Sequence, residues 1–311
     1  MAVEALAGGQ DVQARVYRAR TGAAGAAYLV KVRAVGAARD VAADVTRYLH
    51  ETGVPHVVAP LRPRDDVTPE SAVSVTVAPF LDCRTGVEAG LSDRHWRDLG
   101  AFARRLHTTV LPPSLGDLLG RETYRPAEID VARSIDAAVA ERRFSAPRAH
   151  EVAALWREHR ERILGIADRT EELGRQLERR APPLVLCHAD LHTWNVLIDA
   201  SGELWVVDWD EAILAPKERD LMFVVGGIGA GLVSPHATSA FFEGYGVTTV
   251  ESLALSYYRH AWAIQDLAGY AERVLVAPRV TDEQRAGAAR VFTGLFAPGE
   301  IVEISARPLE L

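Results

Sequence analysis

Three side chains in the second half of the chain have the types and the order that phosphoryl transfer requires. Asp190 and Asn195 stand in the pattern His-x-Asp-x-x-x-x-Asn that begins at His188, and Asp208 ends an apolar run shortly afterwards. An oxygen from Asn195 and one from Asp208 could ligate one Mg²⁺, a hard cation that takes one or two protein ligands beside phosphates. The carboxylate of Asp190 can accept, or at least orient, an attacking hydroxyl. The pattern therefore indicates a magnesium site beside a catalytic base.

The residues between these side chains predict a hairpin that brings them together. Residues 196–198 and 204–207 are apolar runs typical of strands, and residues 199–202 have turn chemistry. Asn195 and Asp208 are then expected at the open end of the hairpin. Each residue alone would more simply be an ordinary turn residue, because Asp and Asn are common in turns. Their combination and order favour a functional site.

The segment 184–225 resembles the aminoglycoside phosphotransferase and choline kinase family, which is related to the protein kinases. Within that family, residues 208–221 resemble the spectinomycin phosphotransferases in particular. The resemblance extends more weakly over the first 110 residues and is thin after residue 230. It implies that Asp190 is the catalytic base and that Asn195 and Asp208 are magnesium ligands. It also implies that Asp220 is a buried brace of the catalytic loop.

The family resemblance implies an α+β, two-lobed protein-kinase-like fold. A nucleotide-binding lobe with a small antiparallel sheet is expected over residues 1–82, and a larger, mainly helical lobe for catalysis and acceptor binding over residues 83–311. Apolar spacing predicts helices over residues 92–109 and 149–179. With 311 residues and 48% hydrophobic content, the chain is long and apolar enough to bury a sizeable core. The resemblance also implies ATP or GTP as the phosphoryl donor.

The use of lysine points to the phosphate-binding residue of the first lobe. Lys31 and Lys217 are the only lysines among 35 basic residues. Lys31 ends the apolar run 28–30, which is predicted to be a strand. A compact ammonium on a flexible stem suits contact with the α and β phosphates better than a planar guanidinium does. The alternative is a solvated strand residue without a role in binding.

Two further nucleotide contacts are implied by the resemblance. Gly8 and Gly9 occupy the place of the loop that covers the phosphates, and no strand is expected before them because the chain begins so close by. The alternating run 73–78 predicts a strand that ends in a hinge. Backbone groups of Pro79 and Leu81 in this hinge are expected to read the edge of the base.

The partner of Lys31 is expected on a helix predicted over residues 40–50. In the family this helix supplies a glutamate that pairs with the strand lysine, but no glutamate stands there in this chain. Asp44 is the candidate that takes its place, and Asp40 is the alternative.

The acceptor is expected to meet residues near the motif and in the C-terminal part. Asp210 and Glu211 directly follow the metal site, and the predicted helical region 241–275 carries Trp262 and Asp266 among several aromatic residues. Aromatic rings and carboxylates could hold a cationic sugar or cyclitol by stacking and ion pairing. For each residue alone, a place in the helix core or on a solvated face is the simpler interpretation.

Composition excludes several classes of function. No apolar stretch of about 18 uncharged residues exists, and no signal peptide is indicated, so a membrane span is not expected. Cys83 and Cys187 have no metal-site spacing, which favours a reducing cytoplasm. The net charge of −7 disfavours nucleic acid and favours a cationic small molecule as partner.

The sequence therefore predicts an ATP- or GTP-dependent O-phosphotransferase for an aminoglycoside or aminocyclitol antibiotic, with spectinomycin as the first candidate. A metabolic kinase for choline, a sugar or an amino alcohol would use the same catalytic residues and remains an alternative. A third alternative is an inactive nucleotide-binding regulatory module, which the missing helix glutamate favours and the complete catalytic set disfavours. The hydroxyl that is phosphorylated and the oligomeric state are left open.

Overall fold

The computed structural model of the chain describes residues 2–6, 14–22, 25–34, 41–62, 73–225, 228, 233–278 and 280–307. Its contacts divide the chain into two compact units. The first unit comprises Met1–Gly120, Leu186–Leu214 and Ser239–Gly246, and the second comprises Arg121–Val185, Ala215–Thr238 and Val247–Leu311. This division does not follow the expected boundary between residues 82 and 83, which stays a prediction.

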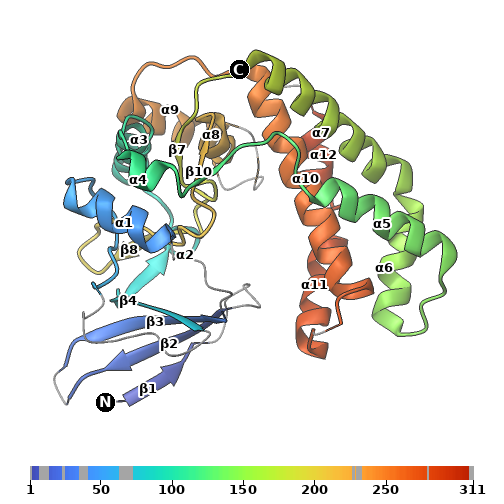
Figure 1. Cartoon of the computed structure of the whole chain (residues 1–311), viewed down its shortest axis with the longest axis horizontal. Coiled ribbons are helices and arrows are strands. Elements are labelled where there is room, and N and C mark those ends of the chain that lie inside the picture. The colour runs from blue at the N-terminus through green and yellow to red at the C-terminus, as the bar shows by residue number, and fades with distance from the viewer. Residues whose placement is uncertain are drawn as a thin grey trace. The chain divides into compact units, whose positions relative to one another are not determined.

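A four-stranded antiparallel sheet begins the first unit (Figure 1). Its strands, in spatial order, are β1 (Ala2–Ala5), β2 (Ala14–Arg20), β3 (Ala27–Ala34) and β4 (Val73–Pro79). The expectation that no strand precedes Gly8 is wrong, because β1 pairs with β2 along its whole length. The strands predicted around Lys31 and over residues 73–78 are confirmed.

The register of this sheet determines which side chains share a face. Val16 of β2 lies opposite Lys31, and Lys31 lies opposite Thr76 of β4. Because directly opposed residues of antiparallel strands project to the same side, these three side chains lie in one row. Helix α1 (Val41–Glu51) follows β3, and its buried residues include Val45 and Leu49, as the predicted helix requires.

The predicted catalytic hairpin is confirmed. Strands β8 (Val196–Asp199) and β9 (Leu204–Val206) pair in antiparallel fashion, and β5 (Cys83–Thr85) extends the sheet on the other side of β8. Asp199 holds the turn, because its Oδ1 accepts hydrogen bonds from the Ser201 and Glu203 backbone N–H groups at 2.8 and 3.0 Å. Gly202 has a φ of 82°, which only glycine adopts readily.

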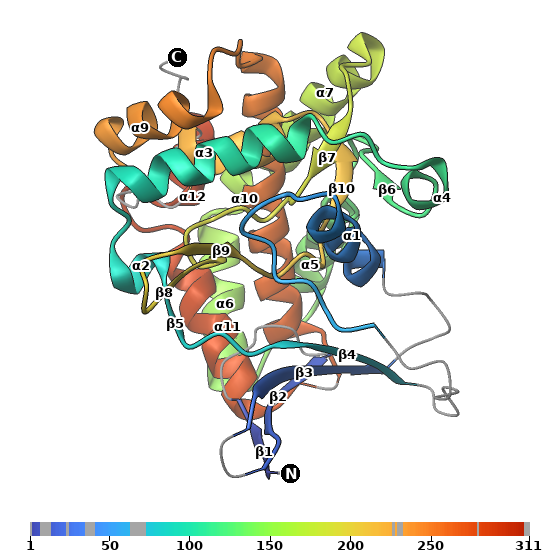
Figure 2. The same cartoon turned by 90° about the vertical axis from the view of Figure 1, so that its left-hand side faces the viewer.

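Two glycines permit a close helix contact within the first unit. Helix α3 (Asp93–His107) starts with a capping box at Ser92 and buries the stripe of apolar residues that the spacing predicts. It packs on the C-terminal part of α9 (Pro235–Tyr245), which lies beside it in Figure 2. A Cβ at Gly100 would be 2.0 Å from the Phe241 carbonyl oxygen, and one at Gly244 would be 1.9 Å from that of Arg97. The helices could not approach this closely with larger residues.

Two short helices and the buried His107 also belong to the first unit. The short helices are α2 (Gly86–Ala89) and α4 (Pro113–Gly116). His107 at the end of α3 lies in the interior, where its Nδ1 is 2.8 Å from the Tyr245 hydroxyl. This is the satisfied core position expected for a histidine at the end of an apolar stripe.

The second unit is a group of helices arranged around one central helix, α10 (Ser252–Leu275) (Figure 1). The surrounding helices are α5 (Glu128–Glu141), α6 (Pro147–Glu158), α7 (Arg160–Arg180), α8 (Glu218–Val225), α11 (Asp282–Gly294) and α12 (Ile301–Ala306). Thirteen residues of α10 are buried, so its sequence lacks a wide polar face. None of the helices in the described ranges combines the length and the apolar character that a membrane crossing would need.

The prediction of a single helix over residues 149–179 is wrong. The segment forms two helices, α6 and α7, which meet at His159 with φ −102° and ψ 12°. The imidazole of His159 stacks on Phe296 at a centroid distance of 4.3 Å. A tertiary contact of this kind overrides local helix propensity and is invisible to a spacing argument.

A further short sheet has three strands. Its strands are β6 (Gly120–Arg121), β10 (Ile213–Ala215) and β7 (Val185–Cys187). Cys83 and Cys187 are both free cysteines.

Candidate active site

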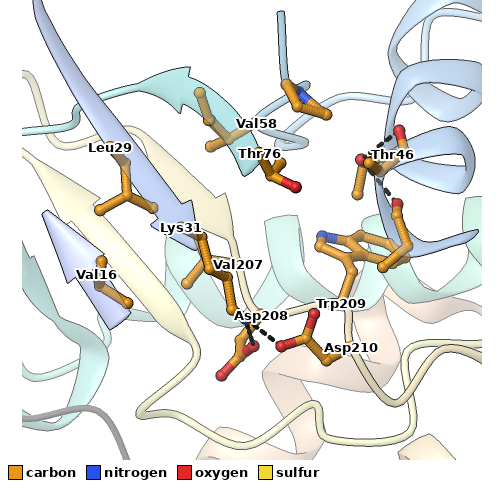
Figure 3. A pocket seen from close by; sticks show the side chains of 14 residues that line it. Val16, Leu29, Lys31, Thr46, Val58, Thr76, Val207, Asp208, Trp209 and Asp210 are labelled. Carbon is orange, nitrogen blue, oxygen red and sulfur yellow. Dashed lines mark hydrogen bonds and ion pairs between the residues drawn. The ribbon is translucent and has the colours of Figure 1, made fainter. Parts of the chain in front are cut away.

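A cavity of about 280 Å³ lies in the first unit between the sheet face, α1 and the segment 207–210 (Figure 3). Leu29 and Ala78, which are paired across β3 and β4, line it with other apolar side chains. Lys31, one row further along β3, lines it together with the carboxylates of Asp208 and Asp210. The cavity thus joins an apolar slot to a charged region, as a site for a base and its phosphates requires.

Lys31 is held by carboxylates that follow the hairpin. Its ammonium contacts the Asp210 carboxylate directly and lies 3.6 Å from Asp208 Oδ1 (Figure 3). Asp44, the expected partner, instead forms an ion pair with Arg47 at 2.7 Å. In this structure, the pairing of Lys31 is therefore with the motif carboxylates, and the pairing with Asp44 stays a prediction.

Asp210 is shared between two cations. The Arg33 guanidinium contacts the same carboxylate oxygen as Lys31 does. Burial opposes the ionisation of Asp210, but the ammonium of Lys31 and the charge of Arg33 outweigh it and lower the pKa of Asp210 below its usual range. Asp210 is thus a carboxylate at neutral pH. The structure places it in the pocket expected for nucleotide, and its predicted contact with the acceptor stays a prediction.

The catalytic loop is organised around Asp190. The Asn195 amide donates to the Asp190 backbone oxygen at 2.9 Å and to its carboxylate Oδ2 at 2.7 Å. His192 Nε2 lies 3.2 Å from Oδ1 of the same carboxylate. His188 braces the loop, since its Nδ1 accepts from the Asp190 backbone N–H at 3.3 Å and its Nε2 lies 3.0 Å from the Val207 carbonyl oxygen. The carboxylate therefore has a fixed orientation.

The neighbours of Asp190 also determine its charge. Burial opposes ionisation, but the hydrogen bonds from His192 and Asn195 outweigh it and lower the pKa of Asp190 below its usual value. Asp190 is therefore a carboxylate throughout the physiological range, and it is ready to accept a hydrogen bond. The preceding residue, Ala189, has a φ of 69°, an uncommon conformation for a residue other than glycine. Such local strain is found most often at functional sites.

Asp208 differs from Asp190 in its electrostatics. Its side chain is 52% exposed, and its backbone φ is 66°. Although half of the side chain is exposed, the atoms packed around the carboxyl remove part of its water. This loss, opposed by Lys31 but reinforced by the nearby Asp210 carboxylate, raises the pKa of Asp208 to about 6. The Val207 N–H donates to the Asn195 carbonyl oxygen at 3.0 Å, which fixes Asp208 beside Asn195 at the open end of the hairpin.

These residues fit a magnesium ion. Two hard oxygen donors are available, the Asp208 carboxylate and the side-chain oxygen of Asn195, and among the described residues nothing donates a hydrogen bond to that amide oxygen. A carboxylate whose pKa is raised partly by like charges gains from a nearby cation. The donor set agrees with the predicted metal ligands, whose role stays a prediction.

The other predicted nucleotide contacts are placed as follows. Gly8 and Gly9 lie outside the described residues. Pro79 is the last residue of β4, and Leu81 lies between β4 and β5, where the predicted hinge belongs. The Phe80 N–H donates to the Ala27 carbonyl oxygen at 2.9 Å, so this part of the hinge is tied to β3. Reading of the base by the hinge backbone stays a prediction.

The predicted acceptor residues are not brought together in one unit. Glu211 is an exposed turn residue of the first unit, next to Asp210. Trp262 and Asp266 are half-buried residues of α10 in the second unit. The Trp262 ring packs edge-on against Phe223 at a centroid distance of 5.0 Å. The acceptor roles of these residues stay predictions.

Two residues of the site were not found by sequence reasoning. Arg33 lies two positions after Lys31, and strand alternation could have placed it on the same face. His192 lies two positions after Asp190, but a loop has no periodicity that would predict its contact. The sequence thus contained a signal for Arg33 but none for His192.

Comparison with protein families decides the family of the chain. A model described as the phosphotransferase enzyme family matches residues 3–257, which is more than half of the chain. The chain belongs to the phosphotransferase enzyme family. The resemblance to aminoglycoside phosphotransferases and choline kinases is thereby confirmed, and so is the prediction of a phosphotransferase.

Solved structures of phosphotransferases share the fold. A spectinomycin phosphotransferase in complex with ADP and spectinomycin is 28% identical with a TM-score of 0.87, covering 97% of this chain and 92% of that chain. An ethanolamine kinase of Plasmodium vivax is 14% identical with a TM-score of 0.62, covering 98% of this chain and 83% of that chain. The choline kinase of Streptococcus pneumoniae is 13% identical with a TM-score of 0.53, covering 94% and 92%. The expected kinase-like α+β fold is confirmed.

One curated sequence matches over a short stretch. A 3-deoxy-D-manno-octulosonic acid kinase of Xanthomonas euvesicatoria is 37% identical over 70 residues. The match covers 20% of this chain and 28% of that protein, so it spans little more than a quarter of that relative's length. It adds a sugar kinase to the phosphotransferases that this chain resembles.

Proposed function

We propose that this phosphotransferase transfers the γ-phosphoryl group of ATP or GTP to a hydroxyl of a cationic aminocyclitol or aminoglycoside. One observation carries the proposal. Lys31 and Asp208 face one another at 3.6 Å in a cavity, and the adjoining loop holds Asp190 as an oriented carboxylate. These are the charges that a metal nucleotide and an attacking hydroxyl require.

Each residue has a distinct part in the proposed reaction. Lys31 binds the phosphates nearest the nucleobase, and Asn195 and Asp208 hold Mg²⁺. When bound, the ion neutralises charge on the phosphates. Asp190 accepts a hydrogen bond from the acceptor hydroxyl, aligns its oxygen with the γ phosphorus and takes its proton as the new O–P bond forms. The bond between the γ phosphorus and the β–γ bridging oxygen breaks, and the nucleoside diphosphate leaves. Most of the rate enhancement then comes from positioning and charge neutralisation.

The proposed acceptor class rests on similarity and charge. The spectinomycin phosphotransferase structure is alike over nearly the whole chain at 28% identity, whereas the choline and ethanolamine kinases are alike in fold alone. The net charge of −7 favours a cationic acceptor. Spectinomycin is therefore the first acceptor to test. We place the enzyme in the cytoplasm, where nucleotide is available and cysteines stay reduced.

The proposal is tested by diphosphate release from ATP and from GTP with Mg²⁺. The acceptors to compare are spectinomycin, a deoxystreptamine aminoglycoside, choline, 3-deoxy-D-manno-octulosonic acid and none. We expect diphosphate release that depends on the aminocyclitol and that Asp190→Asn slows about a hundredfold or more. Release with choline or the sugar acid alone would replace the proposed acceptor class. Absence of release with every acceptor, despite nucleotide binding, would contradict the catalytic proposal.

A further inference from the structure

Arg33 is a second cation beside the charged end of the cavity, which it reaches through Asp210, and it has no part in the proposed catalytic step. Its guanidinium contacts the Asp210 carboxylate oxygen that also accepts from Lys31. The three side chains are partly shielded, with exposed fractions of 32% for Arg33 and 22% for each of Lys31 and Asp210. One carboxylate oxygen therefore lies between two cations.

The sheet register places Arg33 beyond Lys31, in the row of side chains that begins with Leu29 in the apolar slot. Leu29, Lys31 and Arg33 alternate with residues of the opposite face, so their side chains lie in a line on one face of β3. Leu29 and Lys31 both line the cavity. Arg33 follows roughly 7 Å beyond Lys31 along the strand. Moving from the apolar end, a ligand would meet Lys31 first and Arg33 next.

The occupant of this position in the structure is a carboxylate, which has the charge of a phosphate oxygen. Asp210 binds an ammonium and a guanidinium at once, and a phosphate group binds the same two cations with more oxygens. The fork of a guanidinium matches two oxygens of one phosphate, whereas an ammonium is a point charge. A nucleoside triphosphate offers three phosphates in sequence, enough to reach both cations.

We propose that Arg33 is a phosphate-positioning residue, which exchanges the Asp210 carboxylate for the outer phosphates when nucleotide binds. The inference rests on the proposed nucleotide site and assigns a cation to the part of the nucleotide beyond the reach of Lys31. Asp210 holds Lys31 in the pocket and Arg33 at its edge before the nucleotide arrives. The exchange leaves no cation without a partner but releases the Asp210 carboxylate from both cations. Its net effect on nucleotide affinity is therefore the gain from the phosphate contacts less the cost of losing the contacts with Asp210.

Four variants and two ligands test the inference. Arg33→Gln removes the charge, Arg33→Lys keeps the charge without the fork, and Asp210→Asn removes the competing carboxylate. Arg15→Gln is the matched control, because Arg15 is an exposed arginine of β2 next to Val16, and alternation directs it to the opposite face of the same sheet. The ligands are adenosine, which lacks phosphates, and the magnesium complex of ATP, with affinity measured by calorimetry.

We expect Arg33→Gln to weaken ATP binding about tenfold to a hundredfold, the range for charge-assisted hydrogen bonds, while its adenosine affinity stays at the wild-type value. Arg33→Lys should recover part of the loss. Arg15→Gln should match the wild type. Asp210→Asn should bind ATP at least as tightly as the wild type, because it removes a competitor for both cations. Adenosine binding reports an intact pocket, so misfolding of a variant would be recognised.

Equal losses of adenosine and ATP affinity in Arg33→Gln would indicate a structural role and overturn the inference. An equally large loss of ATP affinity in Arg15→Gln would also overturn the inference. Weaker ATP binding in Asp210→Asn with unchanged adenosine binding would do so too. Failure of the wild-type protein to bind ATP at all would instead contradict the proposed function itself. The two failures are therefore distinguishable in one set of titrations.

Discussion

Asp190 is fixed by contacts on both carboxylate oxygens, 2.7 Å from the Asn195 amide and 3.2 Å from His192 Nε2. Because its pKa is lowered, it is a weak base that orients the acceptor before it takes the proton. We expect Asp190→Asn to lower turnover about a hundredfold to ten-thousandfold and to leave nucleotide affinity nearly unchanged. Steady-state kinetics and titration with ADP measure the two effects. Turnover within a few-fold of the wild type would contradict the role of Asp190.

Asp208 gives the site a second, different response to pH. Because its pKa is raised to about 6, it takes up a proton as the pH falls through that value, and Mg²⁺ must then compete with the proton. We expect the apparent dissociation constant for Mg²⁺ to rise about tenfold per pH unit below pH 6 and to be nearly constant above pH 7. Titration with Mg²⁺ at constant ADP, from pH 5 to 8, measures this. An affinity independent of pH would contradict the assignment of Asp208 as ligand.

The raised pKa of Asp208 also affects the stability of the fold. Protonation, which weakens Mg²⁺ binding, favours the folded state. In the unfolded chain the Asp208 carboxyl titrates near 4, so between about pH 4 and 6 the folded state binds a proton that the unfolded state lacks. Its contribution to the free energy of unfolding is therefore present at low pH and is lost as the pH rises through about 6. Without Mg²⁺, Asp208→Asn should unfold at a higher temperature than the wild type at pH 7.5. This advantage should diminish towards pH 4.

At the scale of elements, the contact between α3 and α9 depends on glycine. A Cβ added at Gly100 would come within 2.0 Å of the backbone of Phe241, whereas one added at Gly165 in α7 would meet nothing within 4 Å. We expect Gly100→Ala to lower the free energy of unfolding by about 1–3 kcal/mol through overpacking. The matched control, Gly165→Ala, should raise it by about 0.5–1 kcal/mol, because alanine favours the helix. Denaturant unfolding measures both, and equal effects would contradict the packing argument.

The elements that position the site could largely be predicted, because their signals are local. An apolar run predicted the strand of Lys31, and apolar runs with turn chemistry predicted the hairpin that Asp199 closes. The missed elements depend on distant partners: β1 is a strand because β2 pairs with it, and α6 ends at His159, which stacks on Phe296. A short exposed strand and a helix break have little local signature.

The composition of the site was predicted better than its pairing. The residue types and their order predicted that Asp190, Asn195 and Asp208 lie close together, and their chemical roles stay predictions. The partner of Lys31 was expected on α1, yet in the structure the ammonium contacts Asp210, a residue 179 positions away. Contacts between residues so distant in sequence are determined by tertiary packing, which spacing and propensity do not encode.

At the scale of the whole molecule, the side chains proposed to bind nucleotide belong to the first compact unit, and the helices around α10 belong to the second. Nucleotide should therefore protect backbone amides of the first unit, in β3 and in residues 186–214, from hydrogen exchange, because bound segments open less often. Helices α11 and α12 of the second unit should exchange as in the empty protein. Exchange measured by mass spectrometry with and without magnesium ADP tests this. Protection confined to the second unit would contradict the placement of the nucleotide site.

The central claim is that the γ-phosphoryl group passes to an acceptor hydroxyl at Asp190. Its most direct test is to incubate the protein with Mg²⁺, spectinomycin and ATP that carries ¹⁸O in the γ phosphate, and to follow the label by mass spectrometry. We predict labelled phosphospectinomycin in amounts equal to the ADP released, and a rate of its formation about a hundredfold to ten-thousandfold lower with Asp190→Asn. Label found only in inorganic phosphate, or the same rate of product formation with Asp190→Asn, would contradict the claim.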